Sequence, residues 1–197
     1  MDIQPVTLAG RHVRLEPLAV EHAEALFPEA NEAEIWRYMP YGDVDSVHKL
    51  RAVIVDLLGR QARGTDLCFV TVMKTLGKPV GMTRFMDIQR QHRSVEIGGT
   101  WLGRAHRRTA ANTEAKFLMF CHAFETWGSI RLQIKTDLRN ERSQRAIERL
   151  GLAREGVLRK HIIMPDGYQR SSVYYSVIDE EWPAVKARCE ALLAAGG

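Results

Sequence analysis

The sequence predicts an α+β fold, in which helices pack on a largely antiparallel mixed sheet. Apolar and alternating segments of strand length cluster in the middle of the chain and near its C-terminus, and most neighbours are joined tightly. Segments with helical apolar spacing precede and follow them. A strand–helix–strand step around residues 113–136 permits one parallel pair of strands.

Seven segments have the composition and the flanking turns of strands. They lie at residues 12–18, 67–73, 79–88, 94–102, 130–137, 157–164 and 171–178. The sequence KTLGK after the second segment is a turn signal, so the second and third segments are expected to form a hairpin. Gly98 and Gly99 weaken regular pairing in the fourth segment and predict a β-bulge or a splay there.

Capping residues and prolines indicate where the helices begin and end. Residues 21–40 predict one or two short helices, interrupted near Pro28 and stopped by Pro40. Ser46 is expected to cap the next helix, whose apolar residues recur at helical spacing. Further helices are expected at 113–128, at 140–151 and from 182 onward.

Length and composition favour one soluble globular domain over residues 1–197, with 45% hydrophobic and 26% charged residues. There is no apolar run of about 18 residues and no secretory signal pattern, so we expect a cytoplasmic protein without a membrane partner. The three cysteines are far apart and predict buried free thiols, and the histidines lack the spacing of metal ligands. The net charge of +4 suits an anionic ligand, but no Lys/Arg run indicates a nucleic-acid arm.

The stretch HRRTAANTEA, residues 106–115, joins two arginines to small residues at a helix start. A helix N-terminus presents unpaired N–H groups at the positive end of the helix dipole, which together stabilise an anion. Alanine adds only a methyl group to such a surface, threonine and asparagine can cap the helix or donate to an oxygen, and arginine adds charge. An ordinary helix start beside two solvated arginines is the alternative. The residues concerned are Arg107, Arg108, Thr109, Ala110, Ala111 and Asn112.

The surroundings of this stretch resemble a known family. VEIGGTWL runs into it, and IRLQIKTDLRNERSQRAIERLGLAREGVLR and DGYQRSSVYYSVIDEEW follow. This ordered set resembles the GNAT superfamily of acyl-CoA N-acyltransferases, in its RimJ/RimL-type branch, over residues 9–183. The resemblance implies a GNAT-like fold of about seven strands, helices on both faces of the sheet, and a splay between the fourth and fifth strands. It also implies an N-acetyltransferase that uses acetyl-CoA.

The same resemblance implies where acetyl-CoA lies. Its diphosphate would rest on the main chain from Arg108 to Thr113. Arg107 matches the leading residue of the family pattern, whereas Ala110 and Asn112 replace the family's glycine and its second small residue.

The pantetheine arm of acetyl-CoA would lie along the fourth strand, as the resemblance implies. Main-chain groups of Thr100, Trp101 and Leu102 would bind it as if it were a further strand. The side-chain amide of Asn140 would meet the same arm, and a plain helix cap is the alternative for this residue.

Acetylation of an amine needs a proton acceptor for the amine and a proton donor for the thiolate. Glu96 is the candidate base, directly or through a water, and alternation places it on the face of Gly98 and Thr100 unless a bulge breaks that parity. A structural hydrogen bond or salt bridge is the alternative for Glu96. Ile147 occupies the position of the family's tyrosine donor, so the resemblance points to Ser143 instead, for which helix capping is the alternative.

The segment EIWRYMPYG, residues 34–42, lies where such folds have acceptor loops. Trp36, Tyr38 and Tyr41 are expected to wall a cleft for the amine, and Arg37 to meet an acidic group of it. An aromatic core cluster is the alternative. The acceptor is expected to be a protein or peptide N-terminus or a small-molecule amine.

Two other functions remain open from the sequence. A CoA-binding sensor or regulatory module without turnover is favoured by the missing tyrosine and the missing glycines. An RNA- or ribosome-associated protein would need a more basic chain than this one. Exposed sheet edges are compatible with a homodimer.

Overall fold

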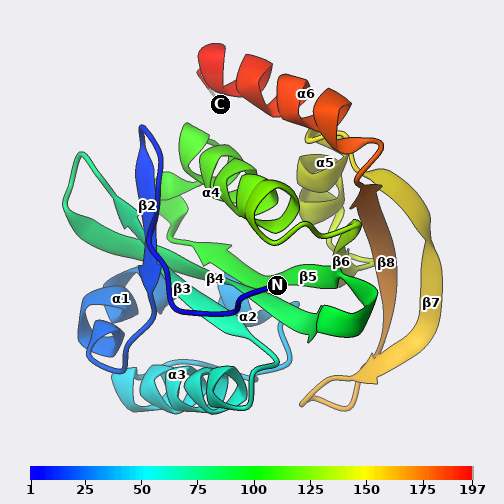
Figure 1. Cartoon of the computed structure of the whole chain (residues 1–197). Helices are drawn as coiled ribbons and strands as arrows, with labels where there is room; N and C mark the ends of the chain where they lie inside the picture. The colour runs from blue at the N-terminus through cyan, green and yellow to red at the C-terminus, as the bar shows by residue number, and fades with distance from the viewer. Residues whose placement is uncertain (197) are drawn as a thin grey trace.

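The computed structural model describes residues 1–196, and the predicted α+β class is confirmed. The strands form one sheet in the order β1-β2-β3-β4-β5-β6-β8-β7, with helices on both faces (Figure 1). The strands are β1 (Leu8–Ala9), β2 (Val13–Pro17), β3 (Leu67–Met73), β4 (Lys78–Gln89), β5 (Ser94–Leu102), β6 (Arg131–Asp137), β7 (Ala153–Ile163) and β8 (Gln169–Ile178). The α-helices are α1 (His22–Ala30), α2 (Ala33–Trp36), α3 (Val47–Ala62), α4 (Ala110–Cys121), α5 (Glu141–Arg149) and α6 (Trp182–Ala194). All seven predicted strands are present, and only the two-residue β1 was not foreseen.

Each face of the sheet has its own apolar core. Residues of α4, α5 and α6 pack on the upper face in Figure 1, and residues of α1, α2 and α3 pack on the lower face. The lower helices cover only the half of the sheet that holds β2, β3 and β4 (Figure 1). Within residues 1–196, no helix lies under β6, β8 and β7 (Figure 1).

Most predicted helix ends are confirmed to within a few residues. Ser46 caps α3, because its hydroxyl accepts a hydrogen bond from the Lys49 amide. The interruption predicted near Pro28 is present, but α1 continues through Pro28 and ends at Ala30, and α2 begins at Ala33. A proline cannot donate a backbone hydrogen bond inside a helix, and α1 ends within two residues of it. None of the helices among residues 1–196 has the length and apolar character that crossing a bilayer requires.

A buried carboxylate ties α4 to the start of the sheet. Glu114 is 4% exposed, and its two oxygens accept hydrogen bonds of 2.7 Å from the amides of Arg11, His12 and Val13. Gly10 leaves room for it, since a Cβ there would lie 2.3 Å from the carboxylate carbon. Glu114 therefore fixes the first strands against the helix that begins at residue 110.

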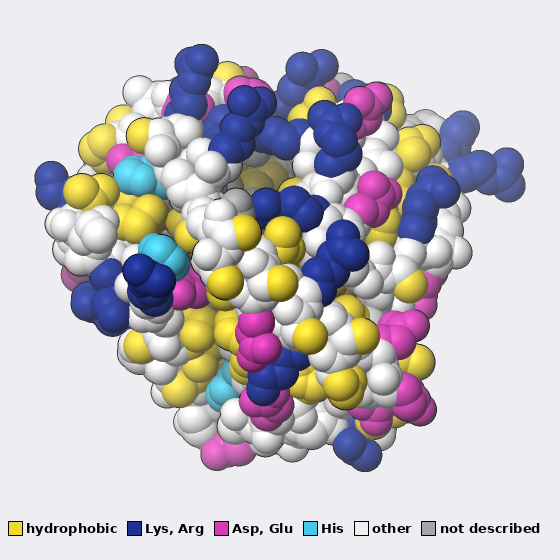
Figure 2. All heavy atoms as spheres, turned by 90° about the horizontal axis from the view of Figure 1, so that it is seen from above, with side chains coloured by type: hydrophobic (Ala, Val, Ile, Leu, Met, Phe, Trp, Pro, Cys, Tyr) yellow, Lys and Arg dark blue, Asp and Glu magenta, His cyan; other side chains and the backbone are white. Residues whose placement is uncertain are grey.

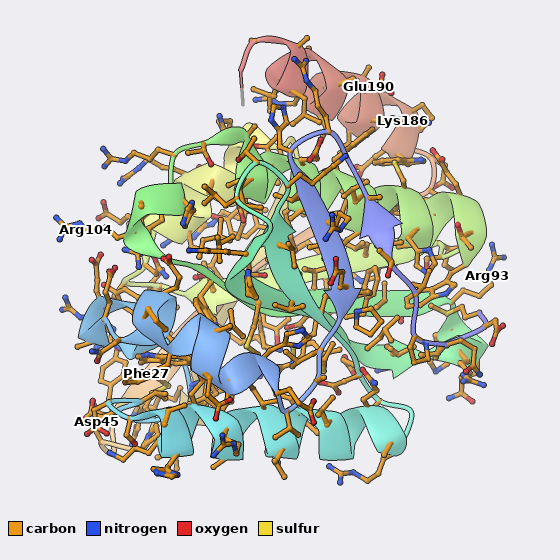
Figure 3. All side chains as sticks on the ribbon, turned by 90° about the vertical axis from the view of Figure 1, so that its left-hand side faces the viewer. Phe27, Asp45, Arg93, Arg104, Lys186 and Glu190 are labelled. Atoms are coloured by element: carbon orange, nitrogen blue, oxygen red, sulfur yellow. The ribbon has the colours of Figure 1, made fainter. Side chains whose placement is uncertain are left out.

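Replacing Glu114 by Gln is expected to lower the free energy of unfolding by about 3 kcal/mol, because an amide cannot accept all three buried N–H groups. Chemical denaturation measures the change. Glu190→Gln, at an exposed site on α6 (Figure 3), is the matched control and should change stability by less than about 0.5 kcal/mol. Equal stability of the two variants would contradict the role given to Glu114.

Candidate active site

The strands β5 and β6 separate where the cofactor arm was expected. They pair in parallel only over Ser94–Glu96 and Arg131–Gln133. Beyond Glu96 this edge of β5 has no strand partner in the part of the chain that the structure describes, whereas β6 stays paired with β8 as far as Asp137. The splay between the fourth and fifth predicted strands is therefore confirmed.

The predicted bulge in β5 is also confirmed. Met82 pairs with Trp101 and Arg84 with Gly98, so two residues of β5 oppose one residue of β4. Gly99 supplies the positive φ of +59° that such a bulge favours. The bulge reverses the alternation of side chains along the rest of the strand.

One expectation about Glu96 is wrong because of this bulge. The Glu96 side chain lies on the lower face, among β6 side chains, whereas the Thr100 hydroxyl lies on the upper face beneath α4. There Thr100 shares hydrogen bonds with the Thr83 hydroxyl and with the ammonium nitrogen of Lys116. The insertion of one residue thus separates two groups that strict alternation would join.

Lys116 lies in the interior without a counter-ion among residues 1–196. It is 5% exposed, its nitrogen contacts only threonine hydroxyls, and burial lowers its pKa from 10.5 to about 7. Between pH 7 and pH 10.5 the folded state therefore binds fewer protons at this site than the unfolded chain does. Its contribution to stability rises with pH across that window and is lost as pH falls toward 7.

We expect Lys116→Met to remove this pH dependence. The stability advantage of the variant over the wild type should be largest near pH 7 and shrink by about 1.4 kcal/mol per pH unit as pH rises. Denaturation at pH 7, 8, 9 and 10 measures it, with the exposed Lys49→Met as control. A difference that stays constant across this range would show that Lys116 keeps an ordinary pKa.

The N-terminus of α4 has free main-chain donors. Thr109 is the N-cap, and its hydroxyl accepts from the Ala111 amide at 3.2 Å. Among residues 1–196, the amides of Arg108, Thr109 and Ala110 have no hydrogen-bond partner. The helix starts at Ala110, so the alanines carry helical geometry and need no glycine there. Lys and Arg side chains gather around a hollow on the face seen in Figure 2.

The unusual backbone of this loop lies at Arg108, whose φ is +59°. A side chain in this region costs about 1 kcal/mol relative to glycine. Arg108 is exposed, and Arg104 also projects outward from the loop before α4 (Figure 3). The loop therefore holds a strained residue and free amides at one point, as sites that bind ligands often do.

Two variants separate the backbone of Arg108 from its charge. Both Arg108→Gly and Arg108→Ala remove the guanidinium, but only glycine accepts the positive φ without strain. We expect the glycine variant to be the more stable by about 0.5 kcal/mol, since its greater freedom in the unfolded chain offsets part of the gain. Thermal unfolding compares them; higher stability of the alanine variant would exclude strain at this position.

Arg107 was predicted to add charge at the phosphate site, but its side chain is engaged elsewhere in this structure. Its Nε donates to the Leu102 carbonyl at 3.0 Å, and its other nitrogens form ion pairs with Glu32 and Glu34. The Arg107 guanidinium thus joins the end of β5 to α2.

Asn140 and Ser143 lie together at the start of α5. The Asn140 side-chain oxygen accepts from the Ser143 amide at 3.1 Å, so Asn140 caps the helix while its NH2 group has no partner within residues 1–196. Ser143 is half-buried and its hydroxyl is likewise unpaired there. Ile147 is buried in the upper core, as its apolar side chain requires. The Nη2 of Arg149 on α5 donates a hydrogen bond to the Thr113 hydroxyl at 2.7 Å, which places α5 beside the first turn of α4.

Glu96 closes the narrow end of the splay. It is 2% exposed, and its Oε2 accepts from Lys135 at 2.7 Å and from Gln133 at 3.0 Å. A salt bridge, the alternative considered for Glu96, is therefore present. Its second oxygen, Oε1, has no partner in the described chain and lies next to Gly98.

The open lower face beyond Glu96 carries polar residues that the sequence analysis did not assign. Tyr174 on β8 lies 3.4 Å from the Nε2 of His161, whose Nδ1 lies 3.1 Å from the Ser172 hydroxyl. Burial raises the pKa of Tyr174 to about 12, and burial and nearby cations lower the pKa of His161. His161 is half-buried, and its ring is held between the Ser172 and Tyr174 hydroxyls. The alternation of polar and apolar residues in β6 and β8 is the sequence signal that could have predicted this polar face.

The predicted acceptor loop divides into core and cleft residues. Trp36 is 4% exposed and packs against Trp101, and the Tyr41 hydroxyl is held by Arg84 at 2.6 Å, so both belong mainly to the lower core. Tyr38 and Arg37 remain at the rim, where the Arg37 guanidinium lies 5.4 Å from the Tyr38 ring centre.

A cavity of about 470 Å³ lies between this loop and the β7–β8 turn. Its wall includes one face of Trp36, together with Arg37 and Met39 from the loop and Met164 and Pro165 from the turn. The cavity is large enough for a small amine or the end of a peptide.

No cysteine takes part in this arrangement. Cys68, Cys121 and Cys189 are free thiols, as predicted, and burial raises the pKa of Cys68 to about 12 and of the other two to about 11. Thiols held in the protonated form are poor nucleophiles.

Comparison with known proteins gives one consistent result. The family model described as "Acetyltransferase (GNAT) domain" matches residues 12–153. A provisionally named acetyltransferase from T. thermophilus is 42% identical, with a TM-score of 0.89 over 98% of this chain and 100% of that chain. Mycobacterium smegmatis RimJ, in complex with CoA-disulfide, is 21% identical, with a TM-score of 0.79 over 95% of this chain and 92% of that chain. "Uncharacterized N-acetyltransferase p20" of Bacillus licheniformis is 25% identical over 79% of this chain and 86% of its own length.

Proposed function

The chain belongs to the GNAT acetyltransferase family, whose members use acetyl-CoA, and we propose that it transfers the acetyl group directly to a primary amine. The acceptor is the N-terminus of a protein or peptide, or a small-molecule amine. The observation that carries this proposal is the juxtaposition of the splay between β5 and β6 with the free amides that begin α4.

The residues present fit acetyl-CoA. The amides of Arg108, Thr109 and Ala110 would bind its diphosphate, with help from the α4 dipole and the Arg108 charge. The unpaired edge of β5 around Thr100, Trp101 and Leu102 would bind the pantetheine arm as an added strand, although the Leu102 carbonyl is already held by Arg107.

The same proposal assigns a role to the polar side chains of Asn140, Glu96 and Ser143. Asn140 would donate its free NH2 group to the pantetheine arm. Glu96 Oε1 would accept the proton of the attacking amine, directly or through a water, while Lys135 and Gln133 hold Oε2 in place. Ser143 would donate a proton to the departing thiolate. When bound, acetyl-CoA supplies the thioester that the amine attacks.

Two observations favour the rival proposal of a CoA-binding module without turnover. Glu96 is in a salt bridge, and the buried Ile147 occupies the position at which the family commonly has a tyrosine donor. The two proposals agree on cofactor binding and differ on catalysis.

One experiment separates them. The purified protein is mixed with acetyl-CoA and a panel of amines, and thiol release and acetylated product are followed. Product formation with any amine supports the transferase, whereas CoA binding by calorimetry without product from any amine would support the binding module. Failure to bind CoA at all would contradict both.

A further inference from the structure

The lower face of the sheet contains a buried arginine that forms no salt bridge within residues 1–196. Arg170, at the start of β8, is 6% exposed. Its Nε donates to the Ser172 hydroxyl at 3.1 Å and its Nη1 to the Tyr38 carbonyl at 2.9 Å, and Nη2 has no partner in the described chain. Burial lowers the pKa of Arg170, although the charges of Asp137 and Glu96 act in the opposite direction.

The carboxylates near Arg170 are already neutralised by other cations. Asp137 is fully buried and is bound by Arg139 at 2.8 Å, and Glu96 is bound by Lys135 at 2.7 Å. This cluster on β5, β6 and β8 therefore holds three cations and two carboxylates. Of these three cations only Arg170 forms no salt bridge within residues 1–196, and a buried charge gains when an anion binds to it directly.

Arg170 is also well placed relative to the proposed active site. Its contact with Tyr38 joins it to the predicted acceptor loop, and its contact with Ser172 puts the guanidinium level with Asp137 of β6. Tyr174 and Lys135, the partner of Glu96, lie in register two residues farther along these strands. Two residues of a strand span about 7 Å.

We propose that Arg170 binds a carboxylate of the acceptor, so that the preferred substrates are primary amines that also carry a carboxylate. This inference rests on the proposed transferase function. Linear amino acids fit this description, as do short peptides with an acidic group close to the N-terminus. The planar guanidinium offers Nη2 and the second hydrogen of Nη1 to the carboxylate.

The test uses pairs of amines that differ only in charge. Aminobutyrate, aminohexanoate and an alanyl-aspartyl peptide are each compared with their uncharged amides, in wild type, Arg170→Gln and Arg170→Lys. The wild type should show a kcat/KM at least tenfold higher for the carboxylate member of the best pair. Arg170→Gln should make kcat/KM equal for the two members of the pair, and Arg170→Lys should keep part of the preference for the carboxylate. Structural damage lowers both members equally, so the ratio reports recognition alone.

A second readout does not depend on turnover. The carboxylate members should raise the thermal unfolding temperature of the wild type more than their amides do, and Arg170→Gln should remove that difference. Equal ratios and equal thermal shifts for acid and amide in the wild type would overturn the inference while leaving the transferase proposal intact. CoA binding without acetylation of any amine would instead contradict the proposed function, and the thermal shifts would still decide whether Arg170 binds a carboxylate. The two kinds of ligand, free amino acids and peptides, are distinguished by which pair gives the larger ratio.

Discussion

Replacing Glu96 by Gln will lower kcat about a thousandfold if Glu96 accepts the proton of the amine, because a positioned base contributes factors of this order. The binding of CoA should be unchanged, since Glu96 lies on the lower face and away from the start of α4. Steady-state kinetics and calorimetry measure the two effects separately.

A variant that also removes the salt-bridge partner of Glu96 provides the control for this result. Glu96→Gln leaves Lys135 without its partner and is expected to lower stability by about 2 kcal/mol, since the Lys135 side chain is only 18% exposed. The double variant Glu96→Gln, Lys135→Met removes both charges and should regain most of that stability. If Glu96 is the base, activity stays low in the double variant. Recovery of activity together with stability would show that Glu96 has only a structural role.

The second large effect is expected at the start of α4. Asn112→Asp changes no volume but adds a negative charge within the first turn, close to the proposed diphosphate site. Repulsion at this distance should weaken CoA binding about a hundredfold. The helix itself should be unharmed, because an acidic residue in the first turn interacts favourably with the helix dipole.

Two controls limit the interpretation of Asn112→Asp. Ser46→Asp adds the same charge at the start of α3, on the other face of the sheet, and should leave CoA binding unchanged. Pantetheine, which lacks the diphosphate, should bind the wild type and Asn112→Asp equally well. Weaker pantetheine binding by the variant would point to a disturbed fold rather than to lost phosphate recognition.

Local rules were sufficient for most of the fold. Apolar periodicity and turn residues located every long strand, and the Gly98-Gly99 pair predicted the bulge. The break predicted near Pro28 is present but lies two residues later, because α1 continues through the proline to Ala30. The face on which Thr100 lies was also misjudged, because a bulge of one residue changes which side chains share a face.

The site was less predictable than the fold. Main-chain donors at the start of α4 follow from local sequence, and the structure has them free. The commitment of Arg107 to Glu32 and Glu34 could not be seen, because its partners lie more than seventy residues away in the chain. Arg170 and Lys135 were missed for a similar reason: whether a polar strand face is solvated or encloses a ligand depends on which helices cover it.

The central claim is that the first amides of α4 bind the diphosphate of CoA. Amide chemical shifts of Arg108, Thr109 and Ala110, followed by NMR during a CoA titration, test it most directly. We expect these three amides to shift together and to saturate at the dissociation constant measured by calorimetry, whereas pantetheine leaves them in place. Amides that remain unmoved when the protein is saturated with CoA would contradict the claim.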